Sequence, residues 1–189
     1  MSQVIAGTRA WVEGAVIGLN LCPFARSVQL RQQVHYVETD ATDIDGLADA
    51  LCAELQGLVA SDPAVRETTL LILPHMLGDF LDFNDFLGLA EALLRDLDLE
   101  GIVQIASFHP RFQFDGTAPD DVTNATNQSP YPTLHLLRED SVGRAADALA
   151  NPDAIYEQNI ETMRTLGPAG WKALQAQWES DAPGTDSGL

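Results

Sequence analysis

Basic residues are scarce in this sequence, and their scarcity excludes several classes of partner. The 189 residues include 10 Lys and Arg against 28 Asp and Glu, which gives a formal net charge of −18. Nucleic acids and anionic membranes bind basic surfaces, so we expect neither as a partner. All the basic residues are arginines except Lys172.

Cysteines and long apolar runs are also few. The two cysteines, Cys22 and Cys52, are too few for the disulfide framework of a small secreted domain. No apolar stretch approaches the roughly 18 residues that a membrane-spanning helix needs. Residues 1–10 lack the basic and then apolar pattern of a signal peptide. These absences predict a cytoplasmic protein with free thiols.

The apolar content is nevertheless high enough for a folded core. Hydrophobic residues make up 46% of the chain, and a chain of this length buries roughly 70% of its unfolded surface when it folds. We therefore expect a single globular domain over residues 1–179. Residues 180–189 are polar and are expected to form a flexible tail.

Hydrophobic periodicity predicts strands that alternate with helices. Strands are expected at residues 34–38, 68–73, 102–108 and 133–138. Helices are expected at residues 4–19, 42–62, 79–97, 141–149, 151–167 and 171–178. This order predicts an α/β or α+β sandwich of about four strands with helices packed on the sheet. The first strands should be parallel, and the last two can be antiparallel.

Several helix ends carry capping signals. Thr42 and Ser141 are predicted N-caps. Asn151 with Pro152 should begin the next helix, and Gly167 should end it.

A long segment between the last two predicted strands does not fit a plain fold. Residues 109–132 hold aromatic residues that a disordered linker would lack, and they also hold many polar groups. The segment is either a functional loop or an ordered Ω-loop without a ligand. If it binds a ligand, its candidate residues are His109, Arg111, Asp115, Asn127, Ser129 and Tyr131.

Cys22 is the second candidate. Pro23 can open a helix, which would place the Cys22 sulfur at the positive end of a helix dipole and favour the thiolate. Arg26, one turn later, could stabilise that thiolate or an anionic substrate. A buried structural thiol is the alternative. Cys52 is interpreted as a small core residue.

Together these residues suggest a small-molecule enzyme or ligand-binding protein. In this hypothesis Cys22 is the nucleophile, His109 is the general base, and Arg26 and Arg111 anchor an anionic small molecule. The reaction, any cofactor and the oligomeric state are left open. The alternatives are a thiol redox protein that uses Cys22 and a non-catalytic interaction module.

Four histidines raise the question of a metal site. His75 and His109 each follow a predicted strand and would meet at one sheet edge if those strands were parallel neighbours. A third ligand would be needed, such as Asp79 or Asp115, and no metal-binding spacing is present. No metal is therefore predicted. His35 and His135 lie within predicted strands and are interpreted as structural.

Two resemblances bear on these hypotheses. Residues 22–25, Cys-Pro-Phe-Ala, are similar to the active-site tetrapeptide of monothiol glutaredoxins and omega-type glutathione transferases, but in those folds a strand precedes the cysteine. More of the chain resembles the bacterial domain-of-unknown-function family 1415. The segments that carry this resemblance are residues 18–25, 82–87, 104–110, 129–139 and 159–160. Gln128 stands where that family is expected to have Arg. The family has no established activity, so the resemblance adds little about the chemistry of this chain.

Overall fold

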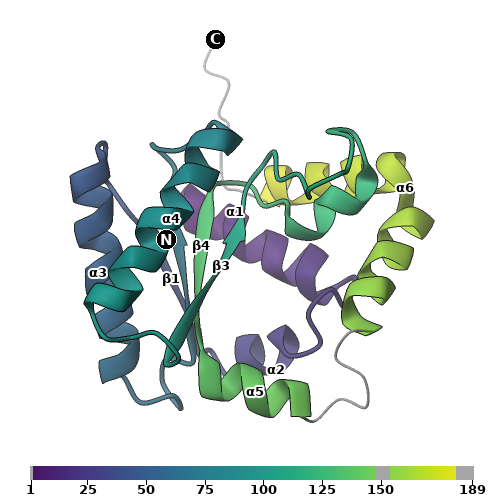
Figure 1. The fold of residues 1–189 in the computed structure, drawn as a ribbon. Coiled ribbons are helices and arrows are strands. Elements are labelled where there is room, and N and C mark those ends of the chain that lie inside the picture. The colour runs from purple at the N-terminus through teal and green to yellow at the C-terminus, as the bar shows by residue number, and fades with distance from the viewer. Residues whose placement is uncertain (1, 148–153, 182–189) are drawn as a thin grey trace.

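A four-stranded mixed sheet forms the centre of the fold (Figure 1). The computed structural model describes residues 2–147 and 154–181, with side chains through Trp178. The strands are β1 (Val34–Glu38), β2 (Thr68–Ile72), β3 (Val103–Phe108) and β4 (Thr133–Arg138), in the spatial order β1-β2-β4-β3. β1 pairs parallel with β2, and β4 is antiparallel to both of its neighbours. This confirms the predicted α/β or α+β class with about four strands.

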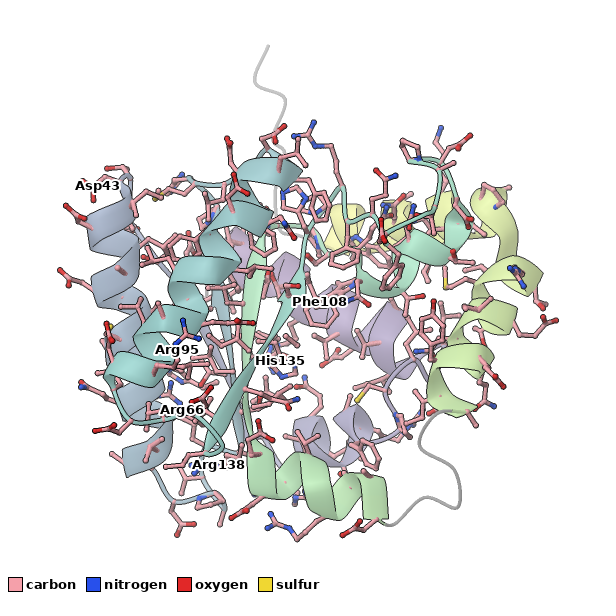
Figure 2. The ribbon with its side chains drawn as sticks, in the orientation of Figure 1. Asp43, Arg66, Arg95, Phe108, His135 and Arg138 are labelled. Atoms are coloured by element: carbon pink, nitrogen blue, oxygen red, sulfur yellow. The ribbon has the colours of Figure 1, made fainter. Side chains whose placement is uncertain are left out.

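Helices cover both faces of the sheet because alternate side chains of each strand point to opposite faces. α3 (Ile44–Ala60) and α4 (Phe80–Asp96) lie on one face, and α1 (Gln3–Trp11) and α6 (Ala154–Asp181) lie on the other (Figure 1). On the α3 and α4 face the core includes Leu71, Leu134 and Leu136, whereas Leu70 packs with Trp11 on the opposite face. Figure 2 shows Phe108 and His135 on the α1 side of the sheet and Arg95 on the α4 side.

Aspartates cap the two helices of the first face. Asp43 is the N-cap of α3, and its Oδ1 accepts from the Gly46 amide at 2.8 Å. The prediction of Thr42 as the cap was wrong by one residue. Thr42 and Asp43 both have side chains that can cap a helix, but only Asp43 directly precedes the first helical residue, Ile44. Asp79 caps α4 and accepts from the Leu81 amide at 2.9 Å.

The first helix differs from the prediction of one continuous helix. α1 ends at Trp11 and continues as a π-helical segment, η1 (Val12–Ile17). Such segments are rare and occur frequently at functional sites. After η1 the short α2 (Ala25–Leu30) begins, with Phe24 rather than Cys22 at its N-cap position. Cys22 is therefore not the helix cap that the sequence predicted, because Pro23 lies in a turn before the helix.

At the C-terminal end, α5 (Glu139–Asp147) follows β4 directly, so it begins before the predicted cap Ser141. The predicted helix end at Leu149 and the predicted cap at residues 151–152 lie outside the described residues. Gly167 has φ of 68°, which divides α6 at the predicted helix end. α6 extends to Asp181, and residues 182–189 of the predicted tail are not described.

Within the described part of the chain, no helix is both long and apolar enough to cross a membrane.

Candidate functional site

His109 lies just beyond β3, fully buried between aromatic rings. Its ring centroid is 5.3 Å from that of Phe80 and 5.1 Å from that of Phe83. Nδ1 accepts a hydrogen bond from the Arg111 amide at 2.9 Å, so Nε2 carries the proton and donates to the Leu77 carbonyl at 3.0 Å. Burial lowers the pKa of this histidine. With both nitrogens occupied, the ring fixes the start of the long loop and offers no free lone pair.

The two arginines proposed as anion anchors are both exposed. The Arg111 guanidinium donates to the Gly78 carbonyl at 2.6 Å and lies 3.3 Å from an Asp79 carboxylate oxygen. Hydrogen bonds from backbone amides, chiefly that of Leu81, lower the pKa of Asp79. Arg26 lies on α2 and, like Arg111, lines neither the apolar cavity described below nor the hollow beside Phe112. The anion-binding role of these arginines therefore stays a prediction.

The other candidate residues of the loop mostly hydrogen bond within the protein. The side-chain amide of Asn127 donates to the Ser107 carbonyl at 3.3 Å, and the Ser129 hydroxyl donates to the Tyr131 carbonyl at 2.6 Å. Asp115 is exposed and lines a shallow hollow beside Phe112. Their proposed contacts with a substrate stay predictions.

Further side chains fix this loop from within. The Asn124 Oδ1 accepts from the Phe114 amide at 3.0 Å and from the Thr117 hydroxyl at 2.7 Å. The Gln128 side chain donates to a loop carbonyl and accepts from the Trp171 indole at 3.2 Å. The loop also contains a 3₁₀ helix, η2 (Val122–Asn127). These bonds explain the density of polar residues without requiring a ligand.

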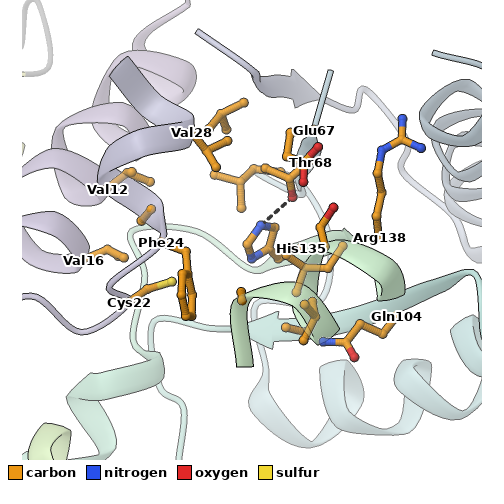
Figure 3. A pocket seen from close by; sticks show the side chains of 18 of the residues that line it. Val12, Val16, Cys22, Phe24, Val28, Glu67, Thr68, Gln104, His135 and Arg138 are labelled. Atoms are coloured by element: carbon orange, nitrogen blue, oxygen red, sulfur yellow. Dashed lines mark hydrogen bonds between the residues drawn. The ribbon is translucent and has the colours of Figure 1, made fainter. Parts of the chain in front are cut away.

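An apolar cavity of about 410 Å³ lies on the α1 side of the sheet (Figure 3). This volume falls within the roughly 300–1,000 Å³ that is typical of small-molecule sites. Its floor is formed by side chains of three neighbouring strands that point to the same face: Thr68, Leu70, Gln104, Ala106, Phe108, His135 and Leu137. The floor therefore exists only because β2, β4 and β3 pair side by side in the sheet.

The walls come from segments far away in the sequence. η1 contributes Val12 and Val16, the turn before α2 contributes Cys22 and Phe24, and α5 contributes Ser141, Val142, Ala145 and Ala146. Figure 3 shows Val16, Cys22 and Phe24 across the cavity from His135. Cys22 and Phe24 thus belong to this cavity, whereas no residue of the 109–132 loop lines it. A helix precedes Cys22, unlike the strand of the glutaredoxin context.

A pair of hydrogen-bonded side chains interrupts the apolar lining. The Thr68 Oγ1 lies 2.7 Å from the His135 Nε2 and donates to the Leu136 carbonyl at 2.7 Å. A hydroxyl has one proton and a carbonyl can only accept, so both contacts are satisfied only if Nε2–H donates to Oγ1. The neutral His135 ring then carries its lone pair on Nδ1.

The second nitrogen of His135 has no hydrogen-bond partner among the described residues. Part of the side chain remains accessible although it lies deep in the fold, because it borders the cavity. Burial lowers its pKa to about 4, so the ring is neutral at pH 7. Nδ1 is therefore a hydrogen-bond acceptor within an apolar cavity.

Charged groups contribute little to the lining. Arg138 is its one cation among the described residues, and its Nη2 donates to three carbonyls, those of Leu58, Ser61 and Arg66, at 2.6, 2.8 and 3.1 Å. Figure 3 shows its guanidinium directed away from His135. Glu67 supplies a carboxylate. The cavity thus lacks a cationic group beside His135.

Sequence reasoning missed His135, which it interpreted as structural. Alternation along β4 does place His135 and Leu137 on the face opposite Leu134 and Leu136. That signal could have shown that a histidine faces one side of the sheet. It could not show Thr68 as the partner, because the pairing of β2 with β4 is not encoded locally.

A metal site has no support from the described residues. They contain no group of three or more His, Cys, Asp or Glu side chains arranged to hold an ion. The strands before His75 and His109 run in the same direction, but β4 lies between them, so the condition that they be neighbours is not met. Strand order is decided by tertiary packing.

Comparisons with known proteins identify the family and no activity. No curated protein and no solved structure matches the chain. The model of the family described as "Protein of unknown function (DUF1415)" matches residues 3–173, which is most of the chain and agrees with the resemblance of its motifs. This protein therefore belongs to the DUF1415 family.

Proposed function

We propose that this protein binds an uncharged, largely apolar small molecule in the cavity above the sheet. The main support for this proposal is the cavity of about 410 Å³, whose floor and walls are mostly apolar side chains. Burying apolar ligand surface there would contribute roughly 25 cal/mol per Å² removed from water, before the costs of association. A small apolar molecule suits a pocket of this volume.

The sequence analysis predicted an anionic ligand, and the lining favours a neutral one. Arg26 and Arg111 do not line the cavity, and the Nη2 of Arg138 is occupied by backbone carbonyls. Glu67 would repel an anion. An anion would also leave water for a mostly apolar space, where the guanidinium of Arg138 is directed away from His135.

Binding explains the cavity better than nucleophilic catalysis does. Cys22 lines the cavity, but its predicted base His109 does not and has both nitrogens engaged. His135 shares the cavity, yet burial lowers its pKa to about 4, which makes it a weak general base near pH 7. The thiol redox alternative would rest on Cys22 alone.

Naphthalene is a suitable first probe because it is uncharged, rigid and apolar. Calorimetry or fluorescence should show one naphthalene per chain. Ala106→Leu, at the floor beside His135, and Ala145→Phe, in the α5 wall, should each fill the space and weaken binding at least tenfold. Ala53→Leu is the matched control, because Ala53 is exposed on α3 across the sheet.

The proposal fails if the wild-type protein takes up neither naphthalene nor its uncharged analogue 2-naphthol. It also fails if both cavity variants, shown by circular dichroism to be folded, bind naphthalene as tightly as the Ala53→Leu control.

A further inference from the structure

We propose that the ligand of this cavity carries a hydroxyl or other neutral hydrogen-bond donor, which it gives to Nδ1 of His135. This inference rests on the proposed binding function and names the chemical class of the ligand. It would make alcohols and phenols, rather than carboxylates or plain hydrocarbons, the preferred occupants.

The Thr68 hydroxyl fixes the tautomer of His135. Its proton is committed to the Leu136 carbonyl at 2.7 Å, so its oxygen accepts from Nε2–H at 2.7 Å. Rotating the hydroxyl toward His135 would require the other tautomer of the ring and would leave that carbonyl without this donor. The lone pair is therefore held on Nδ1.

The sheet register aims that lone pair at the cavity. His135 lies opposite Leu70 on β2 and Ala106 on β3, and both of these neighbours also line the cavity. Figure 3 shows the Thr68 bond on one side of the ring and the free nitrogen on the side of Phe24 and Cys22. The small Ala106 side chain leaves room beside the ring for a ligand atom.

His109, the other histidine inside the fold, has both ring nitrogens engaged by the protein. Its Nδ1 takes the Arg111 amide and its Nε2 gives to the Leu77 carbonyl. Nδ1 of His135 has no such partner within the described part of the chain, and the residue borders the space that a ligand would occupy.

The same lone pair discriminates between ligand classes. A hydroxyl can donate to Nδ1, a hydrocarbon gains no hydrogen bond, and a carboxylate opposes its own lone pairs to that of the ring. Glu67 adds to the repulsion of an anion. Low basicity makes the ring resist protonation, which would otherwise turn it into a donor for anions.

A matched set of probes tests the inference: 2-naphthol, naphthalene and 2-naphthoate, each titrated into the full chain near pH 7. We expect 2-naphthol to bind about five- to tenfold more tightly than naphthalene, the effect of one net hydrogen bond. 2-Naphthoate should bind more weakly than naphthalene. His135→Phe, which keeps an aromatic ring, should lower the affinity for 2-naphthol to that for naphthalene.

A measurement on the wild-type protein guards against a variant that does not fold. The ¹⁵N spectrum of histidine-labelled protein should show a protonated Nε2 and an unprotonated Nδ1 for His135. The Nδ1 signal should move toward the hydrogen-bonded range when 2-naphthol binds and should move much less with naphthalene.

The outcomes separate this inference from the binding function. Equal affinity for 2-naphthol and naphthalene overturns the inference and leaves the binding function standing. Tightest binding of 2-naphthoate overturns it in favour of an anionic ligand, and a protonated Nδ1 in the free protein overturns the tautomer. Failure of all three probes overturns both proposals.

Discussion

Thr68 and His135 come from neighbouring antiparallel strands, and the Thr68 Oγ1 lies 2.7 Å from the His135 Nε2 at the floor of an apolar cavity. The bond joins residues 67 positions apart in the sequence. It fixes which nitrogen of the ring is protonated and thereby gives the cavity a polar group of defined direction.

Removing the Thr68 hydroxyl should destabilise the protein. Thr68→Val keeps the shape of the side chain but leaves the Nε2–H of His135 and the Leu136 carbonyl without their shared partner. We expect the free energy of unfolding to fall by about 1–3 kcal/mol, measured by urea denaturation.

Thr8→Val is the control for that change. Thr8 is also fully buried, but its hydroxyl donates only to the Val4 carbonyl one helical turn earlier, which accepts a helix hydrogen bond as well. Its loss should be below about 1 kcal/mol. Equal losses in the two variants would contradict the role given to Thr68.

Stability should depend on pH through His135. Burial lowers its pKa to about 4 in the folded protein, against 6.5 as the ordinary value. Below about pH 6.5 the unfolded chain therefore binds a proton that the folded protein refuses, so stability falls as the pH drops toward about 4. The full contribution is about 3 kcal/mol.

This dependence can be isolated with His135→Gln. The stability of the wild type relative to that variant should fall by about this amount between neutral and mildly acidic solution, because other groups cancel in the difference. A nuclear magnetic resonance titration of the folded wild type should place the midpoint of His135 well below 6. A midpoint near the ordinary value would rule out the buried, neutral ring.

His109 should matter for stability and not for cavity binding. His109→Leu leaves the Leu77 carbonyl and the Arg111 amide without a partner and disturbs the packing between Phe80 and Phe83. A loss of about 2–4 kcal/mol is expected. The affinity for naphthalene should stay within about twofold, since His109 does not line the cavity.

Arg111→Gln provides the comparison at the same loop. Its ion pair with Asp79 is exposed, so its loss should cost less than about 1 kcal/mol. If His109→Leu abolished naphthalene binding while the protein stayed folded, the loop would have to be included in the site.

A bound ligand should protect one cysteine and not the other. Cys22 lines the cavity, whereas Cys52 lies on α3 across the sheet. Saturating naphthalene should slow alkylation of Cys22 by N-ethylmaleimide at least fivefold in Cys52→Ala protein. In Cys22→Ala protein the rate at Cys52 should not change. Equal rates at Cys22 with and without naphthalene would place the probe elsewhere.

Local patterns in the sequence were sufficient for much of the fold. The apolar run before Leu73 predicted the buried β2, and the apolar stripe after Asp79 predicted α4 to within a residue of its observed ends. Gly167 was recognised as a helix end, and it has the positive φ that glycine adopts without strain. These features depend on residues that are close together in the chain, so they can be predicted from a single sequence.

The functional site was predicted less well, because the many polar and aromatic side chains of residues 109–132 were taken as a sign of function. The polar residues of the long loop mainly satisfy the backbone of that loop, as Asn124 does for the Phe114 amide. Cys22 and Phe24 do line the cavity, but its defining polar pair was missed.

The sequence by itself determined the acidic character, the family, the kinds of elements and the faces of each strand. Only the tertiary structure decided that β4 lies between β2 and β3, and this order places His135 beside Thr68 and Ala106. The physical reason is that periodicity arises from contacts within one element. Strand order arises from long-range packing, which minimises exposed apolar surface and unpaired backbone groups across the whole sheet.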